Sequence, residues 1–330
     1  MRSCSRLLVV LAAVIALPAS VSADPMDVAL ARLRLEQPDG SFRADNDSWS
    51  SLMSQLGNVI APPLLSPART TGFRHFYLGF ETSIVQIDDN ADYWAVGTEG
   101  DSMAIGRNRF VDSTLNLSRL HLRKGLPFGL ELGLSAGHIF NTSYWVWGGS
   151  LKISLMEGFR KGLAAFIPDV AIRASVQTLT GDGEYNLTVP SLDVIASKPF
   201  VLGRTVVLTP IVGVQFFWTA ADSESVDLTP EVDEWATCNA NPNLSPRPDD
   251  MWALPTPACR GDGSDFQNEV EFSRFRAFRS RIVVGFNLRY QIFQLAGSIH
   301  WDLQSPTSDA DVPDGTARQF NVTVAGGVYY

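Results

Sequence analysis

Hydrophobic and polar residues alternate with a period of two along much of this 330-residue chain. The clearest example is residues 319–330. One side of that segment carries Phe320, Val322, Val324, Gly326, Val328 and Tyr330. The other side carries Gln319, Asn321, Thr323, Ala325, Gly327 and Tyr329. A period of two places successive side chains on opposite faces of a β-strand, so the pattern predicts strands with one apolar and one polar face.

Ten segments of this kind are predicted, at about residues 73–86, 109–122, 129–137, 145–155, 170–177, 184–196, 204–218, 281–291, 293–304 and 319–330. The phase of the second shifts between Leu117 and Leu120, which suggests a β-bulge. Pro210 is awkward inside the seventh, because proline cannot donate to a strand ladder. Turns near residues 124–128, 157–168, 198–203 and 291–293 are expected at one end of the strands, and the longer loops at the other.

An apolar face on each strand favours an all-β fold, a closed antiparallel transmembrane barrel of about ten strands with no exposed sheet edge. An even number of strands also returns both barrel ends to the same side. Twelve strands remain an alternative if residues 88–108 or 221–270 contain another hairpin. The soluble alternative is a β-sandwich, which would have to bury the apolar face and expose the polar one.

The final segment, which ends on the aromatic Tyr330, resembles the C-terminal strand of Gram-negative outer-membrane β-barrels. The resemblance is architectural, covers about residues 73–330 and identifies no single subfamily. It implies a cell outer membrane location and recognition of Gln319–Tyr330 by the outer-membrane assembly machinery. Interfacial aromatic belts are expected from Trp145, Trp147, Trp218, Trp301, Tyr290, Tyr329 and Tyr330.

Residues 1–23 have the features of a cleaved secretory signal peptide. Arg2 and Arg6 precede an apolar run, and small residues precede the expected cut before Asp24. Hydrophobic residues make up 45% of the chain and charged residues only 18%. The expected mature chain has 24 basic and 35 acidic residues, a net charge of −11, which argues against nucleic-acid binding.

Residues 24–72 are expected to form a periplasmic N-terminal arm. Within it, Trp49, Leu52, Met53, Leu56, Val59 and Ile60 fall at helical spacing. Asp47 or Ser48 is placed to cap that helix, and Ala61-Pro62-Pro63 is expected to end it. A shorter helix is expected over residues 26–35. Such an arm is interpreted either as scaffold packed on the barrel rim or as a plug that closes its mouth.

Residues 221–270 are expected to form a long extracellular loop. This segment holds eleven acidic residues against two arginines, a net charge of −9. Cys238 and Cys259 both lie in it, and export favours a disulfide between them. The loop is interpreted either as solvated chain kept soluble by its charge or as a surface that meets cations or lipopolysaccharide. No metal site is predicted, because no histidine or further cysteine stands at ligand spacing.

Placing the apolar face in lipid turns a set of charged residues toward the barrel interior. The set is Glu81, Glu131, Lys152, Arg173, Arg281, Arg289, His300 and Asp302. Side chains can nearly fill a barrel of this size, so the set is interpreted either as a network of ion pairs or as the lining of a narrow, charge-selective pore.

His300 and Asp302 share the inward face of one strand at i, i+2, and a histidine beside a carboxylate is a candidate general base. Ten-stranded outer-membrane proteases have the order Asp-x-His opposite a second acidic pair. This chain has His-x-Asp without that pair, so a structural role is favoured and no enzyme activity or cofactor is predicted.

The first functional expectation is therefore a small pore or passive transporter of small solutes. The alternative is a non-conducting surface, adhesion or membrane-stabilising barrel that acts through its acidic loop. A hydrolase at the barrel rim that uses His300 and Asp302 is a third hypothesis. The expected partners are outer-membrane lipid and lipopolysaccharide, with no nucleic acid, and the protein is expected to be a monomer.

Overall fold

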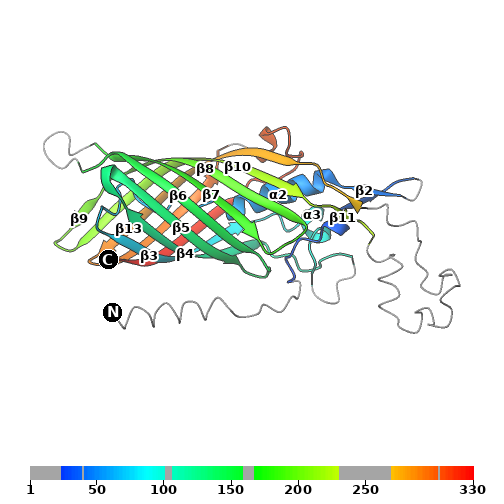
Figure 1. The fold of residues 1–330 in the computed structure, drawn as a ribbon, viewed down its shortest axis with the longest axis horizontal. Coiled ribbons are helices and arrows are strands. Elements are labelled where there is room, and N and C mark those ends of the chain that lie inside the picture. Colours follow the sequence, from blue (N-terminus) through cyan, green and yellow to red (C-terminus); the bar gives the residue numbers. More distant parts are fainter. Residues whose placement is uncertain (1–23, 39–40, 101–105, 159–166, 230–268, 304) are drawn as a thin grey trace.

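The computed structural model describes residues 24–38, 41–100, 106–158, 167–229, 269–303 and 305–330. Ten antiparallel strands make up most of it: β3 (Phe76–Gln86), β4 (Thr114–Gly125), β5 (Leu130–Ile139), β6 (Trp145–Met156), β7 (Asp169–Thr180), β8 (Tyr185–Ser197), β10 (Val206–Ser223), β13 (Phe275–Tyr290), β14 (Phe293–Asp302) and β15 (Phe320–Tyr329). Each pairs with the strands before and after it in this order, and β15 pairs with β3 (Figure 1). The sheet is thus a closed barrel.

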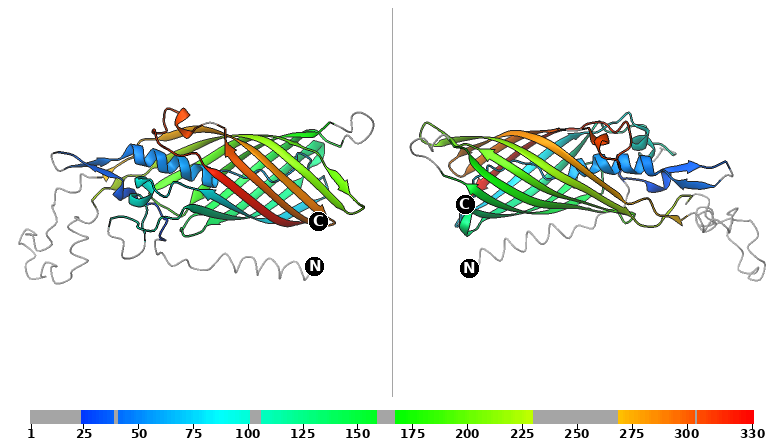
Figure 2. Two further views of the ribbon diagram at one scale, coloured as in Figure 1. Left: turned by 180° about the vertical axis from the view of Figure 1, so that it is seen from behind. Right: turned by 90° about the horizontal axis from the view of Figure 1, so that it is seen from above.

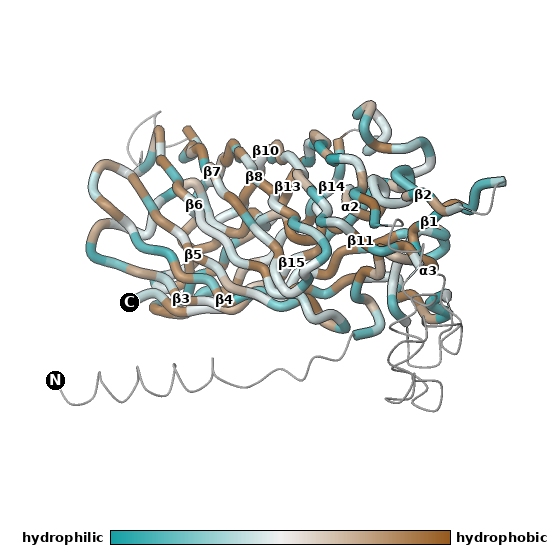
Figure 3. Tube along the Cα trace, turned by 45° about the vertical axis from the view of Figure 1, so that its right-hand side comes forward, coloured by the Kyte–Doolittle hydropathy of each residue, from teal (hydrophilic) through white to brown (hydrophobic). Residues whose placement is uncertain are grey.

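The expected ten-stranded barrel is confirmed, and the β-sandwich alternative is wrong because the sheet closes on itself. A short eleventh strand, β9 (Phe200–Leu202), pairs with the beginning of β10. Along β3, the outward residues Leu78, Phe80 and Ile84 are exposed, whereas the inward residues between them are buried. Figure 3 shows apolar residues (brown) recurring along the strands. The barrel therefore presents an apolar outer surface.

Exposed aromatic residues gather near both ends of the barrel wall. Trp145 and Trp147 lie at the start of β6, and their rings stack 6.3 Å apart. At the opposite end, the rings of Phe76 and Tyr330 lie 5.2 Å apart. Tyr329 was expected in these belts, but its ring lies 5.1 Å from that of Tyr77, whose side chain is 3% exposed. Tyr329 therefore faces the interior.

The expected bulge in β4 is wrong, because β4 pairs with β3 and with β5 without a register shift. The change of phase has another cause. Leu115 and Leu117 point inward and are buried against the N-terminal arm, whereas Leu120 and Leu122 point outward and are exposed. An apolar residue can face the interior here because the interior contains protein rather than water.

Pro210 sits where β10 changes partners. Its neighbour Leu208 pairs with β9, and Ile211 begins the pairing with β8. Neither the pairing of β10 with β9 nor its pairing with β8 includes position 210, so a proline, which has no N–H to donate, is accommodated there.

The two barrel ends differ in their connections. The turn end holds Tyr330, the connections at residues 126–129, 198–205 and 291–292, and residues 157–158 and 167–168; a 3-10 turn, η2 (Pro127–Gly129), lies in the first connection. The loop end holds residues 87–100 and 106–113 with helix α3 (Asp92–Val96), and the turns at 140–144 and 181–184. The same end holds the paired strands β11 (Val226–Asp227) and β12 (Glu269–Val270). It also holds the 3-10 turn η7 (Pro306–Ser308). Cys238, Cys259 and residues 1–23 lie outside the described residues.

The N-terminal arm lies at the loop end, not at the turn end where a periplasmic arm was expected. It contains a 3-10 turn, η1 (Leu30–Arg32), a hairpin of β1 (Arg34–Glu36) and β2 (Phe42–Ala44), and helix α2 (Asn46–Ile60). The hairpin projects away from the C-terminal end in both views of Figure 2. The arm lies at this end because it docks on the loops there: Val28 forms a β-bridge with Thr98 in the loop after β3.

A helix over residues 26–35 is not formed. The backbone groups there pair with the loops instead; for example, the Met26 N–H donates to the Asn141 carbonyl at 3.0 Å. The expected longer helix is confirmed, with Asp45 rather than Asp47 or Ser48 as its N-cap residue. No helix among the described residues is long and apolar enough to cross a membrane.

Candidate functional site

Helix α2 lies inside the barrel, toward the loop end. It contacts six different wall strands, β3, β4, β7, β8, β10 and β13, which only a helix within the lumen can do. Its residues at helical spacing, from Trp49 to Ile60, are almost completely buried. The Trp49 ring packs edge-on against Tyr185, with ring centroids 5.8 Å apart. Burial of every residue from Ser51 to Ile60 fits an interior plug rather than a surface scaffold.

Gly57 shows how closely the helix approaches the wall. A β-carbon at this position would lie 2.3 Å from the Thr219 hydroxyl oxygen on β10, well inside van der Waals contact. Glycine costs helix stability, so its presence in the last turn of α2 is explained by this contact.

Residues 61–71 continue from the helix through the lumen to the turn end, where β3 begins. Pro62 and Pro63 stop the helix and bring no N–H groups that would need acceptors. The chain is then held by side chains of the wall, which bond mostly to its backbone. We call residues 46–71 the lumen segment.

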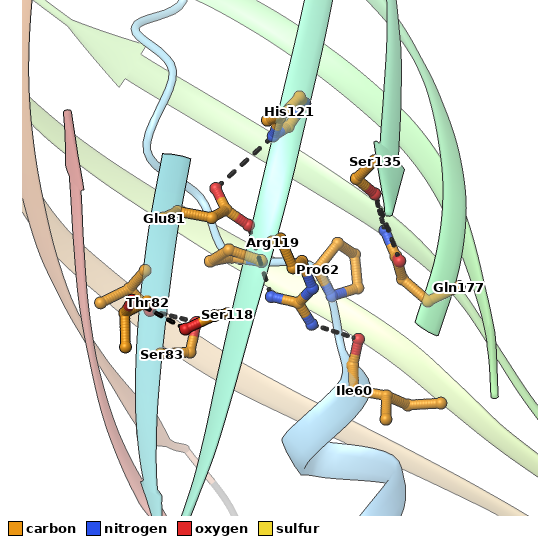
Figure 4. Close-up of polar contacts among 12 residues, drawn as sticks. Ile60, Pro62, Glu81, Thr82, Ser83, Ser118, Arg119, His121, Ser135 and Gln177 are labelled. Atoms are coloured by element: carbon orange, nitrogen blue, oxygen red, sulfur yellow. Dashed lines mark hydrogen bonds and ion pairs between the residues drawn. The ribbon is translucent and has the colours of Figure 1, made fainter. Parts of the chain in front are cut away.

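Cationic and amide side chains of the wall donate to carbonyl oxygens of this lumen segment. The bonds run from Arg119 to Ile60 at 2.8 Å, Gln215 to Pro62 at 3.0 Å, Arg173 to Pro63 at 3.0 Å, Lys152 to Pro67 at 3.0 Å, and Arg279 to Ser54 at 3.0 Å. Figure 4 shows the bond between Arg119 and the end of the helix. Carbonyls at a helix C-terminus lack partners within the helix and attract positive charge, so arginine suits this position.

The wall also accepts hydrogen bonds from the lumen segment. The Leu64 N–H donates to His300 Nε2 at 3.2 Å, the Ala68 N–H to Ser197 Oγ at 2.9 Å, and the Thr71 N–H to Glu131 Oε2 at 2.7 Å. These three acceptors lie at successive depths of the barrel. The segment is thus anchored along the length of the lumen, from the loop end to the turn end.

Most charges of the wall are paired with one another. The pairs are Arg119 with Glu81 at 3.4 Å, Lys152 with Glu131 at 2.8 Å, Arg173 with Asp193 at 2.5 Å, and Arg279 with Asp302. His121 adds a contact of 3.5 Å to Glu81 (Figure 4). Buried ionic groups of this kind are tolerated when each is paired and hydrogen-bonded.

Small cavities lie in the middle of the lumen. Two cavities of about 10 Å³ each lie beside the lumen segment, one near Gly133 and Gln177 and one near Leu65 and Tyr77. Each is hardly large enough for one water molecule. A third cavity, of about 390 Å³, lies at the turn end beyond Pro67.

The structure places the predicted interior residues as follows. Seven of the eight are buried in the lumen: Glu81, Glu131, Lys152, Arg173, Arg281, His300 and Asp302. Arg289 is exposed and borders the cavity at the turn end. That these residues line a conducting pore remains a prediction.

Sequence reasoning missed Arg119, Arg123, Asp193 and Arg279, all of which are buried in the interior. The signal was present. Asp193 lies between the outward-facing Leu192 and Val194. Arg279 precedes Arg281 by two residues, so it faces inward on the same side of the strand. Misreading the phase of β4 hid both of its arginines.

His300 and Asp302 form hydrogen bonds to different groups. The His300 ring accepts the Leu64 N–H, while Asp302 accepts from Arg279 and from the Gln319 N–H. The two residues are 1% and 2% exposed. Both side chains therefore belong to the packing of the lumen segment and the wall, which does not favour the rim hydrolase hypothesis.

No protein-family model and no curated protein matches this chain. Solved structures similar to it are outer-membrane β-barrels. The Ail protein of Yersinia pestis aligns with 78% of this chain and 98% of its own, at 8% identity and a TM-score of 0.25. OprG from Pseudomonas aeruginosa aligns with 80% and 99%, at 10% identity and a TM-score of 0.26. The translocator domain of autotransporter NalP from Neisseria meningitidis aligns with 86% and 96%, at 8% identity and a TM-score of 0.32. These scores are low, so the barrel assignment depends on the strand pairing itself.

Proposed function

We propose that this chain is an outer-membrane barrel whose own lumen segment keeps it closed, and that it acts through the surface at its loop end. The observation that carries this proposal is the path of residues 46–71 through the lumen, with wall side chains bonded to the backbone at successive depths. We expect a lumen filled in this way to have no continuous aqueous path.

Placement in a membrane is supported by the outer surface of the barrel. Large apolar side chains face outward along the strands, among them Leu134 at 63% and Val212 at 50% exposure. Aromatic residues border this surface at both ends. Water is a poor solvent for such a surface, and a bilayer is a good one.

The loop-end surface is supported by contacts that join the arm to the loops. Arg32 pairs with Glu99 at 2.6 Å, in the loop after β3. The Val28 N–H donates to the Tyr144 hydroxyl at 2.7 Å, in the turn after β5. These contacts make the arm and two of the loops one composite surface, suited to a partner outside the barrel.

A gated pore for small solutes is the second candidate. It is favoured by the polar lining of the lumen, where Ser175 and Ser191 on neighbouring strands exchange a hydrogen bond of 2.8 Å. Such a wall would conduct ions if the lumen segment withdrew. The two candidate functions are based on the same structure. They differ in whether the lumen segment leaves the lumen.

Conductance of the refolded mature protein, residues 24–330, in a planar bilayer tests the proposal. The unchanged protein is expected to be silent. Gly57→Val is expected to produce discrete conductance steps, because the added side chain collides with Thr219 and prevents the helix from seating. Ser50→Val is the matched control, since Ser50 lies on the same helix and is only partly buried.

Steps from the unchanged protein at ordinary voltage would contradict permanent closure and favour the gated pore. A silent Gly57→Val protein that is folded, as judged by a heat-dependent gel shift, would show that the helix does not close the lumen. Either result would refute the proposal as stated.

A further inference from the structure

A cavity of about 390 Å³ lies at the turn end of the barrel. Pro67, Arg69, Thr70 and Thr71 of the lumen segment form one side of it. Inward-facing residues of the wall, including Thr209 and Asn287, and residues of the turn-end connections, including Pro199, form the rest. Its volume is within the range of pockets that hold small organic molecules.

Positive charge surrounds this cavity. Arg69 and Arg289 border it, and neither forms an ion pair with the described carboxylates. The Arg289 guanidinium lies over the Tyr329 ring, 5.6 Å from its centroid, which holds it at the rim. Lys198 also borders the cavity and donates to the Ile167 carbonyl at 2.6 Å. A cavity bordered by Arg69 and Arg289 and by one carboxylate, Asp169, favours an anion.

Three residues that line the cavity each have one buried polar atom with no hydrogen-bond partner among the described residues. The atoms are Asn287 Nδ2, Asp169 Oδ2 and Thr71 Oγ1. Asn287 and Asp169 are 3% and 1% exposed. The other Asp169 oxygen accepts the Gly158 N–H at 2.9 Å, so that side chain is fixed in place. Buried polar groups normally have partners, so these atoms indicate a ligand or bound water.

We propose that this cavity binds a small soluble organic anion that carries hydroxyl groups, such as a sugar phosphate. Arg69 and Arg289 pair with the oxyanion, since guanidinium groups bind phosphate and carboxylate through charge-assisted hydrogen bonds. Asn287 donates to an oxygen of the ligand. Asp169 accepts a hydrogen bond from a hydroxyl group of the ligand. Inorganic phosphate is too short to make this bond while it also pairs with the arginines.

A soluble ligand fits better than a lipid headgroup. The wall residues of the cavity occupy inward positions of β7, β10, β13 and β15, namely Asp169, Thr209, Asn287 and Tyr329. These four residues face the lumen, so this part of the cavity wall belongs to the barrel interior and not to the surface that faces the bilayer. This inference goes beyond the proposed function, because the binding is measured on the closed protein and needs no conduction.

Isothermal titration of the refolded mature protein in detergent micelles, with glucose 6-phosphate as the probe at low salt, tests the inference. Arg69→Gln and Arg289→Gln are each expected to weaken binding about tenfold or more. Asn287→Ala is expected to weaken it less, because it removes an uncharged donor. Arg204→Gln is the matched control: Arg204 is exposed at the same barrel end but does not border the cavity. Glucose and inorganic phosphate are each expected to bind about tenfold more weakly than the probe.

The inference is overturned if the probe binds more weakly than about 10 mM. It is also overturned if Arg204→Gln reduces binding as much as the two cavity variants, since the attraction would then be general. Equal binding of inorganic phosphate would refute the role of Asp169 and the ligand class. Binding of short-chain phosphatidylglycerol in place of glucose 6-phosphate would show a lipid headgroup site.

Discussion

Arg281 on the inner face of β13 donates a hydrogen bond of 2.8 Å to the Asn58 side chain, near the end of helix α2. Its other described hydrogen bonds go to the Gln215 side chain and to the carbonyls of Ala61 and Pro62. All these acceptors are uncharged, and three of the four belong to the lumen segment. The buried guanidinium is therefore satisfied mainly by the segment, which links the barrel wall to its occupant.

Asn58→Leu is expected to loosen the lumen segment. The change leaves one donor of a buried guanidinium without its partner, which costs about 1–3 kcal/mol. Amide hydrogen exchange in helix α2 should accelerate by about tenfold or more, while exchange in the barrel strands stays unchanged. Ser50→Leu is the control on the same helix. Unchanged exchange in Asn58→Leu would show that Arg281 does not depend on the segment.

The pair of Arg173 and Asp193 is expected to stabilise the barrel when both partners are present. Asp193→Leu leaves Arg173 buried with an uncompensated charge, at a cost of about 3–5 kcal/mol. The double change Arg173→Leu with Asp193→Leu should recover part of this loss, because no buried charge remains. Urea unfolding of the refolded protein measures the stability of Asp193→Leu, of Arg173→Leu and of the double variant. If the loss of stability in the double variant equals the sum of the two single losses, the two residues are not directly coupled.

The docking of the arm on the loops is expected to strengthen in acid. Burial under the arm raises the pKa of Asp182, and burial together with the charge of Asp182 raises the pKa of Glu184. The Leu30 N–H donates to Glu184 at 3.3 Å, and the Tyr144 hydroxyl donates to Asp182 at 3.0 Å.

A raised pKa means that the docked state binds protons more tightly than the undocked state. The stabilisation is therefore complete below the ordinary carboxyl pKa and is lost as the pH rises through the raised values. Hydrogen exchange at Leu30, corrected for the intrinsic rate, should slow as the pH falls from 8 to 5. Asp182→Asn with Glu184→Gln should remove this dependence, and faster corrected exchange in acid would contradict it.

The orientation of the barrel predicts which residues face the outside of the cell. In a Cys238→Ser, Cys259→Ser background, Arg43→Cys places one thiol on the arm and Arg204→Cys places one at the turn end. Both positions are exposed. A membrane-impermeant maleimide on intact cells should label Arg43→Cys, and should label Arg204→Cys only after the outer membrane is permeabilised. The reverse pattern would place the arm in the periplasm.

The sequence predicted the barrel because its evidence is local. Alternation along β3, β5 and β15 places lipid-facing and inward residues within each strand, whatever the rest of the chain does. The helix over Asn46–Ile60 was also predictable, since its apolar spacing and the prolines after it are contained in one short segment. Seven of the eight expected interior charges are buried for the same reason.

Only the tertiary structure decided what fills the lumen and how its charges are paired. Arg281 and Asn58 are 223 residues apart in the chain, and no local pattern relates them. The inward Leu115 and Leu117 could be explained only once the helix was known to lie beside them. Alternation with a period of two indicates which face of a strand a side chain occupies. It does not indicate whether that side chain meets water, an opposite charge or another part of the same chain. That depends on the route of the lumen segment through the closed barrel, which is a property of the assembled fold.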